Sequence, residues 1–417
     1  MTTPGNPDAG TGRRIAARSA ILLSFIVAFE IVIMISPFAL FFYSVFNPIL
    51  LALDQWRATR WLTAFFLPHM IVPPDAVLMA IRLLGSVLFV VGLAVFLVCA
   101  VQVYAAKAFK TGPAIRGLYA VIRHPQYVAL ACAALGLAIM WPRFLTLVLL
   151  ALMLFLYYLL AKDEERRMLA RYGDSYQEYR RRTGMFLPRP VERLWRGKET
   201  SERPVTVGKG VAILLLLLVT IVGAGFGLRA YTVRHLPLET AGNIDVIGIT
   251  AGDATAGAHL LESVRQDPAV VSRLHAATVP PGGRVLAYAI PVDYTMQGMI
   301  ANTGDEWKLF TQHKTIGMIT DYVIHPSAHL TEGHAQHAGT SPHGMSMHDS
   351  PAMKRRIIFV DVWRDARPLM SSRDDFSIDV RRTPRFFVDV HLHTGEVLQV
   401  KDIPSGSGWG TVPTPMF

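Results

Sequence analysis

Cysteine is almost absent from this sequence, which has two cysteines among 417 residues. Because Cys99 and Cys132 both lie in apolar stretches, neither a disulfide framework nor a cysteine-based zinc site is expected. Charged residues are also sparse, at 17%, whereas hydrophobic residues make up 52% of the chain. Long apolar runs fill 1–230, and 231–417 has an ordinary soluble composition. The sequence therefore predicts an α-helical integral membrane bundle followed by a soluble domain.

The formal net charge of +10 has a distinct location in the chain. Basic residues outnumber acidic ones in 162–209, whereas acidic residues are in slight excess in 231–417. Basic residues next to apolar runs indicate membrane topology, so we expect membrane lipids and no nucleic acid as partners.

Four regions hold the roughly 20 apolar residues that a helix needs to cross a bilayer. These regions are 19–47, 77–105, 126–161 and 209–230. The third is interrupted by Trp141-Pro142-Arg143, which predicts two spans at about 126–141 and 143–161, the first short enough for a tight re-entering hairpin. The sequence thus predicts about five spans.

The first apolar run follows three arginines and superficially resembles a signal peptide. It is too long for a signal-peptide core and no A-x-A-like cleavage site follows it, so we expect a retained span. Glu30 lies in the middle of this span, where a carboxylate is costly in lipid, and is predicted to face protein. The short apolar segment Trp61 to Val72 predicts an interfacial helix.

The distribution of Lys and Arg predicts the orientation. The N-terminus and the segments 105–125 and 162–209 are basic, whereas the arginines of 49–76 are balanced by aspartates. These charges place the N-terminus in the cytoplasm, and the fifth span then makes 231–417 extracytoplasmic.

Two polar and aromatic clusters flank the predicted third and fourth spans. The first, Gly117 to Tyr127, reads GLYAVIRHPQY, and the second consists of Asp163-Glu164-Glu165 and the segment Tyr172 to Tyr179, YGDSYQEY. A short hairpin returns the chain to the same side of the membrane, so the carboxylates are expected close to the imidazole of His124. Each cluster also has a simpler interpretation: 162–182 as an amphipathic surface helix, and Arg-His-Pro as a helix start.

The chemistry of these clusters suits S-adenosylmethionine. Pro125 fits the first turn of a helix, and the free N–H groups there can receive a carboxylate. Carboxylates can bind an ammonium group or ribose hydroxyls, and aromatic faces can bind a cation or adenine. Methyl transfer depends mainly on orientation and exclusion of water, and a site at the membrane suits an apolar methyl acceptor.

The Arg-His-Pro-x-Tyr segment, followed by Glu-Glu and Tyr-Gly-x-x-Tyr-x-x-Tyr, resembles the isoprenylcysteine carboxyl methyltransferase family, and phospholipid N-methyltransferases share much of the pattern. The resemblance covers about 77–190 and implies a methyltransferase that uses S-adenosylmethionine. The cofactor-binding residues that the resemblance implies are Thr111, Gly112, Pro113, Ala114, Tyr119, His124, Pro125, Gln126, Tyr127 and Glu164. Arg123 and Glu165, which belong to the same two clusters, are further candidates for cofactor binding.

Two positions depart from the family pattern. Ala129 stands where members often have glycine, which is a small change. Leu160 stands where eukaryotic members have an arginine for the substrate carboxylate, so the resemblance does not carry over the prenylcysteine substrate. The acceptor stays open as a carboxyl, thiol or amine on a lipid-like or small apolar molecule.

The sequence of 231–417 predicts a β-rich α+β domain. The runs 356–363 and 385–393 are β-branched and aromatic, and His393-Thr394-Gly395-Glu396 predicts a turn between strands. His391 and His393 alternate on the second run and are predicted to be exposed strand residues or, at most, extra metal ligands. The predicted parts of the chain are 1–76, the methyltransferase-like core 77–207, the final span 208–230, and 231–417.

A His/Met-rich stretch at 325–353 raises an alternative function, a metal-binding or metal-sensing envelope protein anchored by the membrane part. Imidazole with thioether ligands suits Cu, and imidazole alone suits Zn. The abundance of Gly, Ser, Thr and Pro between these residues equally fits a mobile loop. The candidate ligands are His325, His329, His334, His337, His343, Met345, Met347 and His348.

Overall fold

In the computed structural model the chain forms two compact units. Unit 1 comprises Met1–Phe42, Val87–Leu137 and Leu149–Leu217, and unit 2 comprises Tyr43–Ser86, Ala138–Val148 and Leu218–Phe417. The predicted span 19–47, with Glu30, lies outside the described residues. The described residues are 50, 52–53, 55–68, 71, 74–109, 115–195, 206–276, 279–292, 353–364 and 367–403.

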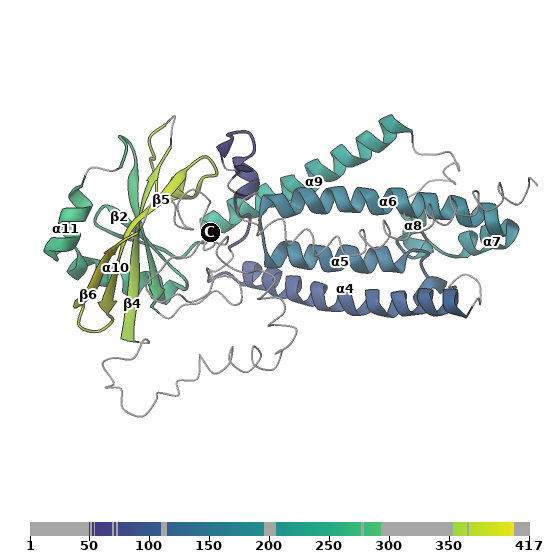
Figure 1. Ribbon diagram of the computed structural model, residues 1–417, viewed down its shortest axis with the longest axis horizontal. Coiled ribbons are helices and arrows are strands. Elements are labelled where there is room, and N and C mark those ends of the chain that lie inside the picture. The colour runs from purple at the N-terminus through teal and green to yellow at the C-terminus, as the bar shows by residue number, and fades with distance from the viewer. Residues whose placement is uncertain are drawn as a thin grey trace, which may run out of the picture. The chain divides into compact units, whose positions relative to one another are not determined.

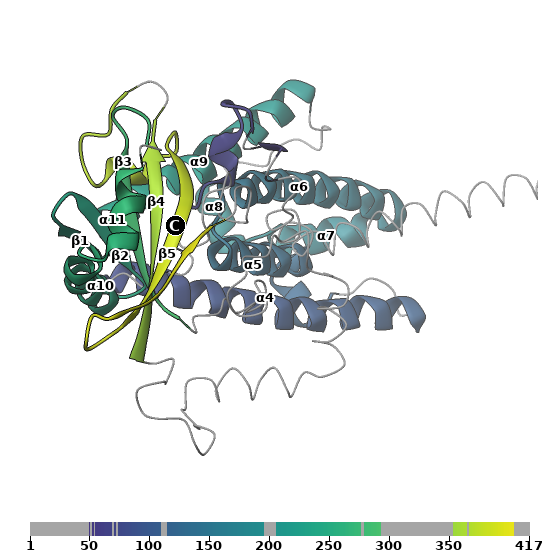
Figure 2. The ribbon, with the colours of Figure 1, turned by 60° about the vertical axis from the view of Figure 1, so that its left-hand side comes forward.

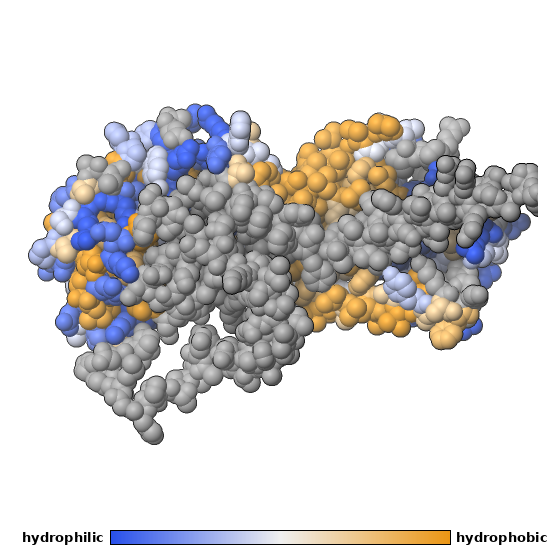
Figure 3. Space-filling model, in the orientation of Figure 1, coloured by the Kyte–Doolittle hydropathy of each residue, from blue (hydrophilic) through white to orange (hydrophobic). Residues whose placement is uncertain are grey.

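Apolar helices form at four of the predicted spans (Figure 1): α4 (Ala76–Ala108), α5 (Pro125–Met140), α6 (Phe144–Tyr172) and α9 (Val207–Arg234). Within the described chain, α4, α6 and α9 are the helices long and apolar enough to cross a membrane, and α5 is a shorter apolar helix. Hydrophobic side chains are exposed along α4 and α9 (Figure 3), including Val101 at 68% and Val219 at 71%. These helices mark an integral membrane protein, but the predicted number of five spans stays a prediction.

The break predicted at Trp141-Pro142-Arg143 separates α5 from α6 and is stabilised from outside the two helices. The main-chain N–H of Phe66 donates to the carbonyl of Pro142 at 2.7 Å, and that of Phe144 donates to Ala64 at 3.0 Å. The guanidinium of Arg143 lies 4.2 Å from the ring centroid of Phe65.

This packing corrects the interfacial helix predicted for Trp61 to Val72. The described part of that segment forms one 3-10 turn, η1 (Arg60–Thr63), followed by buried irregular chain that forms an isolated bridge between Phe65 and Arg143. Pairing with the α5–α6 turn satisfies backbone groups that a helix would otherwise satisfy internally, and tertiary context therefore overrides the apolar pattern.

The predicted β-rich domain is a sheet of six strands in sequence order. Strands β2 and β3 are parallel and the other neighbours are antiparallel. The predicted runs 356–363 and 385–393 correspond to β4 and β5, and Gly395, at φ 68°, lies in the predicted turn between β5 and β6. The strands are β1 (Leu238–Ala241), β2 (Ile244–Gly248), β3 (Arg284–Pro291), β4 (Lys354–Trp363), β5 (Arg381–His391) and β6 (Val397–Asp402).

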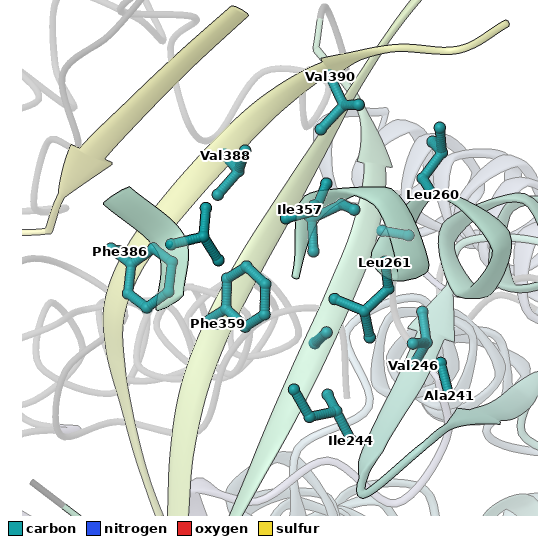
Figure 4. Close-up of a cluster of buried hydrophobic side chains, with 14 residues drawn as sticks. Ala241, Ile244, Val246, Leu260, Leu261, Ile357, Phe359, Phe386, Val388 and Val390 are labelled. Atoms are coloured by element: carbon teal, nitrogen blue, oxygen red, sulfur yellow. The ribbon is translucent and has the colours of Figure 1, made fainter. Parts of the chain in front are cut away.

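The crossover from β2 to β3 contains α10 (Ala251–Val264) and α11 (Pro268–His275), which lie beside the sheet (Figure 2). Thr250 and Asp253 form a reciprocal capping box that begins α10. Apolar residues of α10, such as Leu261, pack against strand residues such as Phe359 in a buried cluster (Figure 4). A Cβ on Gly257 would lie 2.4 Å from the Cβ of Ala289, so this helix approaches the sheet closely.

The C-terminal turns of α9 are joined to the sheet domain within unit 2. Arg229 is buried and donates to the carbonyls of Phe65 and Phe376. Phe376 is the last residue of the short helix η6 (Asp374–Phe376). Tyr231 donates to Asp75 at 3.0 Å. Because α9 continues to Arg234, the linker predicted near 231–241 shortens to the residues before β1.

The structure corrects the prediction for the two histidines of 385–393. His391 ends β5 and is buried, at 7% exposure, whereas His393 is exposed and lies in the following turn. The N–H of Thr394 donates to Nδ1 of His391 at 3.2 Å. The two residues therefore do not alternate on one strand face, and His391 stabilises the turn.

Candidate functional site

The first predicted cluster is part of unit 1 and begins with the short helix η2 (Gly117–Ala120). Tyr119 is buried, and its hydroxyl donates to Oε1 of Gln126 at 3.0 Å. The carbonyl of Tyr119 accepts from the hydroxyl of Tyr179, at 2.6 Å, in α7 (Asp174–Arg182). Burial raises the pKa of the Tyr119 phenol, and it raises that of Tyr179 to about 12, so both hydroxyls stay neutral donors at physiological pH. As predicted, α5 begins at Pro125.

A buried ion pair joins the two predicted clusters. Nε of Arg123 donates to Oε1 of Glu165 at 2.5 Å, and both side chains are almost fully buried. Nη1 of the same arginine donates to the carbonyls of Thr183, at 2.5 Å, and Arg180, at 3.3 Å. Arg123 thus binds a carboxylate of α6, the last turn of α7 and the residue that follows α7.

The residues after α7 form a covering segment, Thr183–Phe186, which the sequence interpretation did not include. Ile122 and Gly184 form a parallel bridge, and the N–H groups of Arg123 and His124 donate to Gly184, at 2.8 Å, and to Met185, at 3.2 Å. The Thr-Gly pair after an arginine-rich helix is a helix-stop signal, but it does not reveal what the chain then pairs with.

Glu192 fixes the other side of the covering segment. This residue lies in α8 (Arg189–Trp195), is buried, and accepts the N–H of Met185 at 2.8 Å. The covering segment is therefore bonded both to the Arg-His-Pro motif and to α8, and its position depends on both.

His124 lies between the two adjacent glutamates. Its side chain is 2% exposed, Nδ1 is 3.5 Å from Oε2 of Glu164, and Nε2 is 3.7 Å from Oε1 of Glu165. Neither ring nitrogen has a hydrogen-bond partner within the described part of the chain. Burial alone would lower the pKa of His124, but the two carboxylates outweigh burial and raise it, which favours the imidazolium form.

The two glutamates differ in access to solvent. The Glu164 side chain is 39% exposed, whereas that of Glu165 is 6% exposed and lies next to Arg123. Glu164 is therefore the carboxylate open to solvent, and Glu165 is the one bound inside the protein.

Two aromatic rings lie next to the imidazole of His124. Phe186, in the covering segment, is 5.9 Å from His124 between ring centroids. Tyr127 stacks on His124 at 5.6 Å and on Tyr157 of α6 at 5.2 Å. These faces can contact a flat heterocycle or a cation.

The family departure at Ala129 is explained by the packing of α4 on α5. Ala129 is 4% exposed, and a Cβ added to Gly92 would lie 2.7 Å from its carbonyl oxygen. The glycine that allows this close approach is therefore on α4. The second departure, Leu160, is half-buried on α6, one turn before Glu164.

The described residues fit S-adenosylmethionine: a half-exposed carboxylate, aromatic faces and a buried imidazole, whose nitrogens have no hydrogen-bond partner among those residues, lie together. The predicted cofactor residues Thr111, Gly112, Pro113 and Ala114 lie outside the described residues.

The predicted metal ligands, His325 to His348, also lie outside the described residues, so that site stays a prediction. Across the described ranges, no group of three or more His, Cys, Asp or Glu side chains is placed to hold a metal ion.

Comparison with known proteins supports the resemblance seen in the motifs. Residues 108–175 match the family model described as phospholipid methyltransferase. A 73-residue stretch is 33% identical to the Protein-S-isoprenylcysteine O-methyltransferase of Schizosaccharomyces pombe, covering 17% of this chain and 31% of that protein. The chain thus spans about a third of the length of this curated relative, and no solved structure matches it. The matched segment is similar to membrane methyltransferases.

Proposed function

We propose that this protein is an S-adenosylmethionine-dependent membrane methyltransferase. The acceptor would be a carboxyl, thiol or amine group on a lipid-like or small apolar molecule. The observation that carries the proposal is the half-exposed Glu164 beside the buried His124, within the segment 108–175 that matches the family model. The basic flanks of the helices favour a cytoplasmic cofactor site and an extracytoplasmic sheet domain.

Each group has a role that follows from its environment. Glu164 would accept hydrogen bonds from the ammonium group of the cofactor. The N–H groups at the start of α5 would donate to the carboxylate of the cofactor. Tyr127 and Phe186 would supply aromatic faces. The bound cofactor supplies an electrophilic methyl group on a sulfonium.

The protein's own contribution is orientation and exclusion of water. The Arg123–Glu165 pair and Glu192 hold the covering segment next to His124. Leu160 provides no charge for an acceptor carboxylate, and exposed apolar residues line α4, so an apolar acceptor can approach from the bilayer.

The Glu164→Gln variant is expected to bind S-adenosylmethionine at least about tenfold more weakly, a loss of about 1.4 kcal/mol, because the charge opposite the ammonium group is removed. Isothermal titration calorimetry of the purified protein in nanodiscs measures the affinity. Asp163→Asn is the matched control, since Asp163 is the preceding residue and pairs at the surface with Arg166 and Arg167. Equal affinity of Glu164→Gln and the unaltered protein would refute the cofactor assignment.

The acceptor can be found with the same protein. Native membranes incubated with methyl-labelled cofactor should take up label in a lipid or small-molecule fraction when they contain the unaltered protein, and much less when they contain Glu164→Gln. Base-labile label would indicate a methyl ester, and stable label would indicate transfer to nitrogen or sulfur.

A further inference from the structure

We propose that binding of the cofactor at this site releases a proton from His124. His124 is the cation opposite Glu164 before the cofactor arrives, and the ammonium group of the cofactor replaces it in that role. This inference rests on the proposed function and adds a coupling between cofactor binding and pH.

The two carboxylates next to His124 are not equivalent partners. Glu165 already receives a hydrogen bond from Arg123 at 2.5 Å, and Nε of Arg180 lies 3.9 Å from its other oxygen. The negative charge of Glu165 is therefore balanced without the histidine. Glu164, whose Oε2 is 3.5 Å from Nδ1 of His124, is then the carboxylate for which a bound cofactor can compete with the imidazole.

Apart from Glu164 and Glu165, no further acidic side chain among the described residues is paired with the imidazole of His124, and Glu192 of α8 accepts the N–H of Met185. Arg123 precedes it in the chain, and α7 supplies Arg180, whose side chain is 22% exposed. Tyr127 of α5 stacks on its ring, and Tyr176 and Tyr179 of α7 are phenols whose pKa values are raised by burial. Phe186 of the covering segment adds an apolar ring.

The charges of this group predict the direction of the effect. With His124 protonated, the group of His124, Arg123, Arg180 and the two glutamates has one positive charge in excess. The cofactor adds an ammonium and a sulfonium against one carboxylate. The ammonium group of the cofactor then pairs with Glu164 and lies near His124, whose side chain is 2% exposed. Two cations so close together in a buried site repel each other, and the neutral form of the imidazole is favoured.

The proton balance is simple. Before binding, His124 holds a proton; after binding, that proton is in the buffer and the imidazole is neutral, with no covalent step. Because a proton is released, the affinity for the cofactor should rise with pH, by up to about tenfold per pH unit, between the pKa of His124 in the complex and its raised pKa in the empty site.

The test is calorimetry of the full-length protein in nanodiscs at about pH 6.5, near the ordinary pKa of histidine. The titration is done in two buffers of different ionisation enthalpy. The observed heat should differ between buffers by an amount that corresponds to release of up to about one proton per bound S-adenosylmethionine. S-adenosylhomocysteine, which keeps the ammonium group but has no sulfonium, should release a similar fraction.

Variants make the result specific. Asp163→Asn should release the same number of protons as the unaltered protein, and His124→Gln should bind without a buffer-dependent heat. If His124→Gln fails to fold, the affinity of the unaltered protein measured across pH provides the second test. Cofactor binding with the same heat in both buffers and an affinity independent of pH would overturn this inference and leave the proposed function standing. Absence of binding in any buffer would overturn both.

Discussion

The Gly184→Ala variant should bind S-adenosylmethionine on the order of 100-fold more weakly than the unaltered protein and melt at a lower temperature. A Cβ at Gly184 would lie 1.8 Å from the carbonyl oxygen of Leu187 and 2.8 Å from Oε2 of Glu192. The nearest atom is backbone, so relief requires the covering segment itself to move. Overpacking of this kind typically costs about 1–3 kcal/mol, occasionally more. Movement would also break the bonds from Arg123 and His124 to Gly184 and Met185.

Gly223→Ala provides the matched control, because nothing lies within 4 Å of a Cβ at that position in α9. This variant should keep both its affinity and its melting temperature. Cofactor affinity is measured by calorimetry and melting by intrinsic fluorescence in the same nanodiscs. A Gly184→Ala protein that behaves like Gly223→Ala would show that the covering segment does not hold the site in place.

The Asp375→Asn variant is expected to stabilise the sheet domain at neutral and alkaline pH. Asp375 is 0% exposed, and neither carboxylate oxygen has a hydrogen-bond partner within the described chain. Nε of Arg284 is 4.0 Å away, and that arginine is bound to Asp245 at 2.5 Å. Burial, with the charge of Asp245, raises the pKa of Asp375 to about 7.

Because the pKa of Asp375 is higher in the folded protein than its ordinary value of 3.8, the neutral acid is the form that the fold prefers. Its contribution to stability is complete below about pH 4 and is lost as the pH rises to about 7. At about 1.4 kcal/mol per pKa unit, the upper limit of the loss is about 4 kcal/mol. Asparagine, which resembles the neutral acid and does not titrate, should remove this loss.

Denaturant unfolding of the full-length protein in detergent, repeated across pH, measures the effect. The curves of Asp375→Asn and the unaltered protein should coincide near pH 4 and separate as the pH rises. Asp374→Asn is the neighbouring control with the opposite sign, since N–H donors from Met370 and Ser371 lower the pKa of Asp374. If the free energies of unfolding of Asp375→Asn and the unaltered protein differed by the same amount at every pH, the assignment would be refuted.

The sequence predicted those parts of the fold that depend on local pattern. Apolar length located α4 and α9, Pro125 located the start of α5, and the run 356–363 located β4. The parallel pairing of β2 with β3 and the bridge of Phe65 to Arg143 were not predicted, because they depend on which distant segments meet. A short apolar run such as Trp61 to Val72 has the same composition whether it forms a helix or packs as irregular chain.

In the candidate site, the sequence indicated the residue types but not their separate roles. Glu164 and Glu165 are adjacent and chemically alike, yet neighbouring helix residues point about 100° apart. One is half-exposed and the other meets Arg123 in the interior. The covering segment was missed because Thr183 and Gly184 carry no chemistry of their own; their importance comes from their backbone bonds.

The position of Arg229 has a consequence for the order in which the protein is assembled. Its guanidinium binds carbonyls 164 residues earlier in the chain, at Phe65, and 147 residues later, at Phe376. During synthesis the second acceptor does not exist until most of the sheet domain has been made. Until β4 and η6 have been synthesised, Arg229 near the C-terminal end of α9 therefore lacks the carbonyl of Phe376 as an acceptor. The contacts of Arg229 are therefore complete only after the chain has been synthesised through Phe376, and a chain that stops before Phe376 lacks this hydrogen bond.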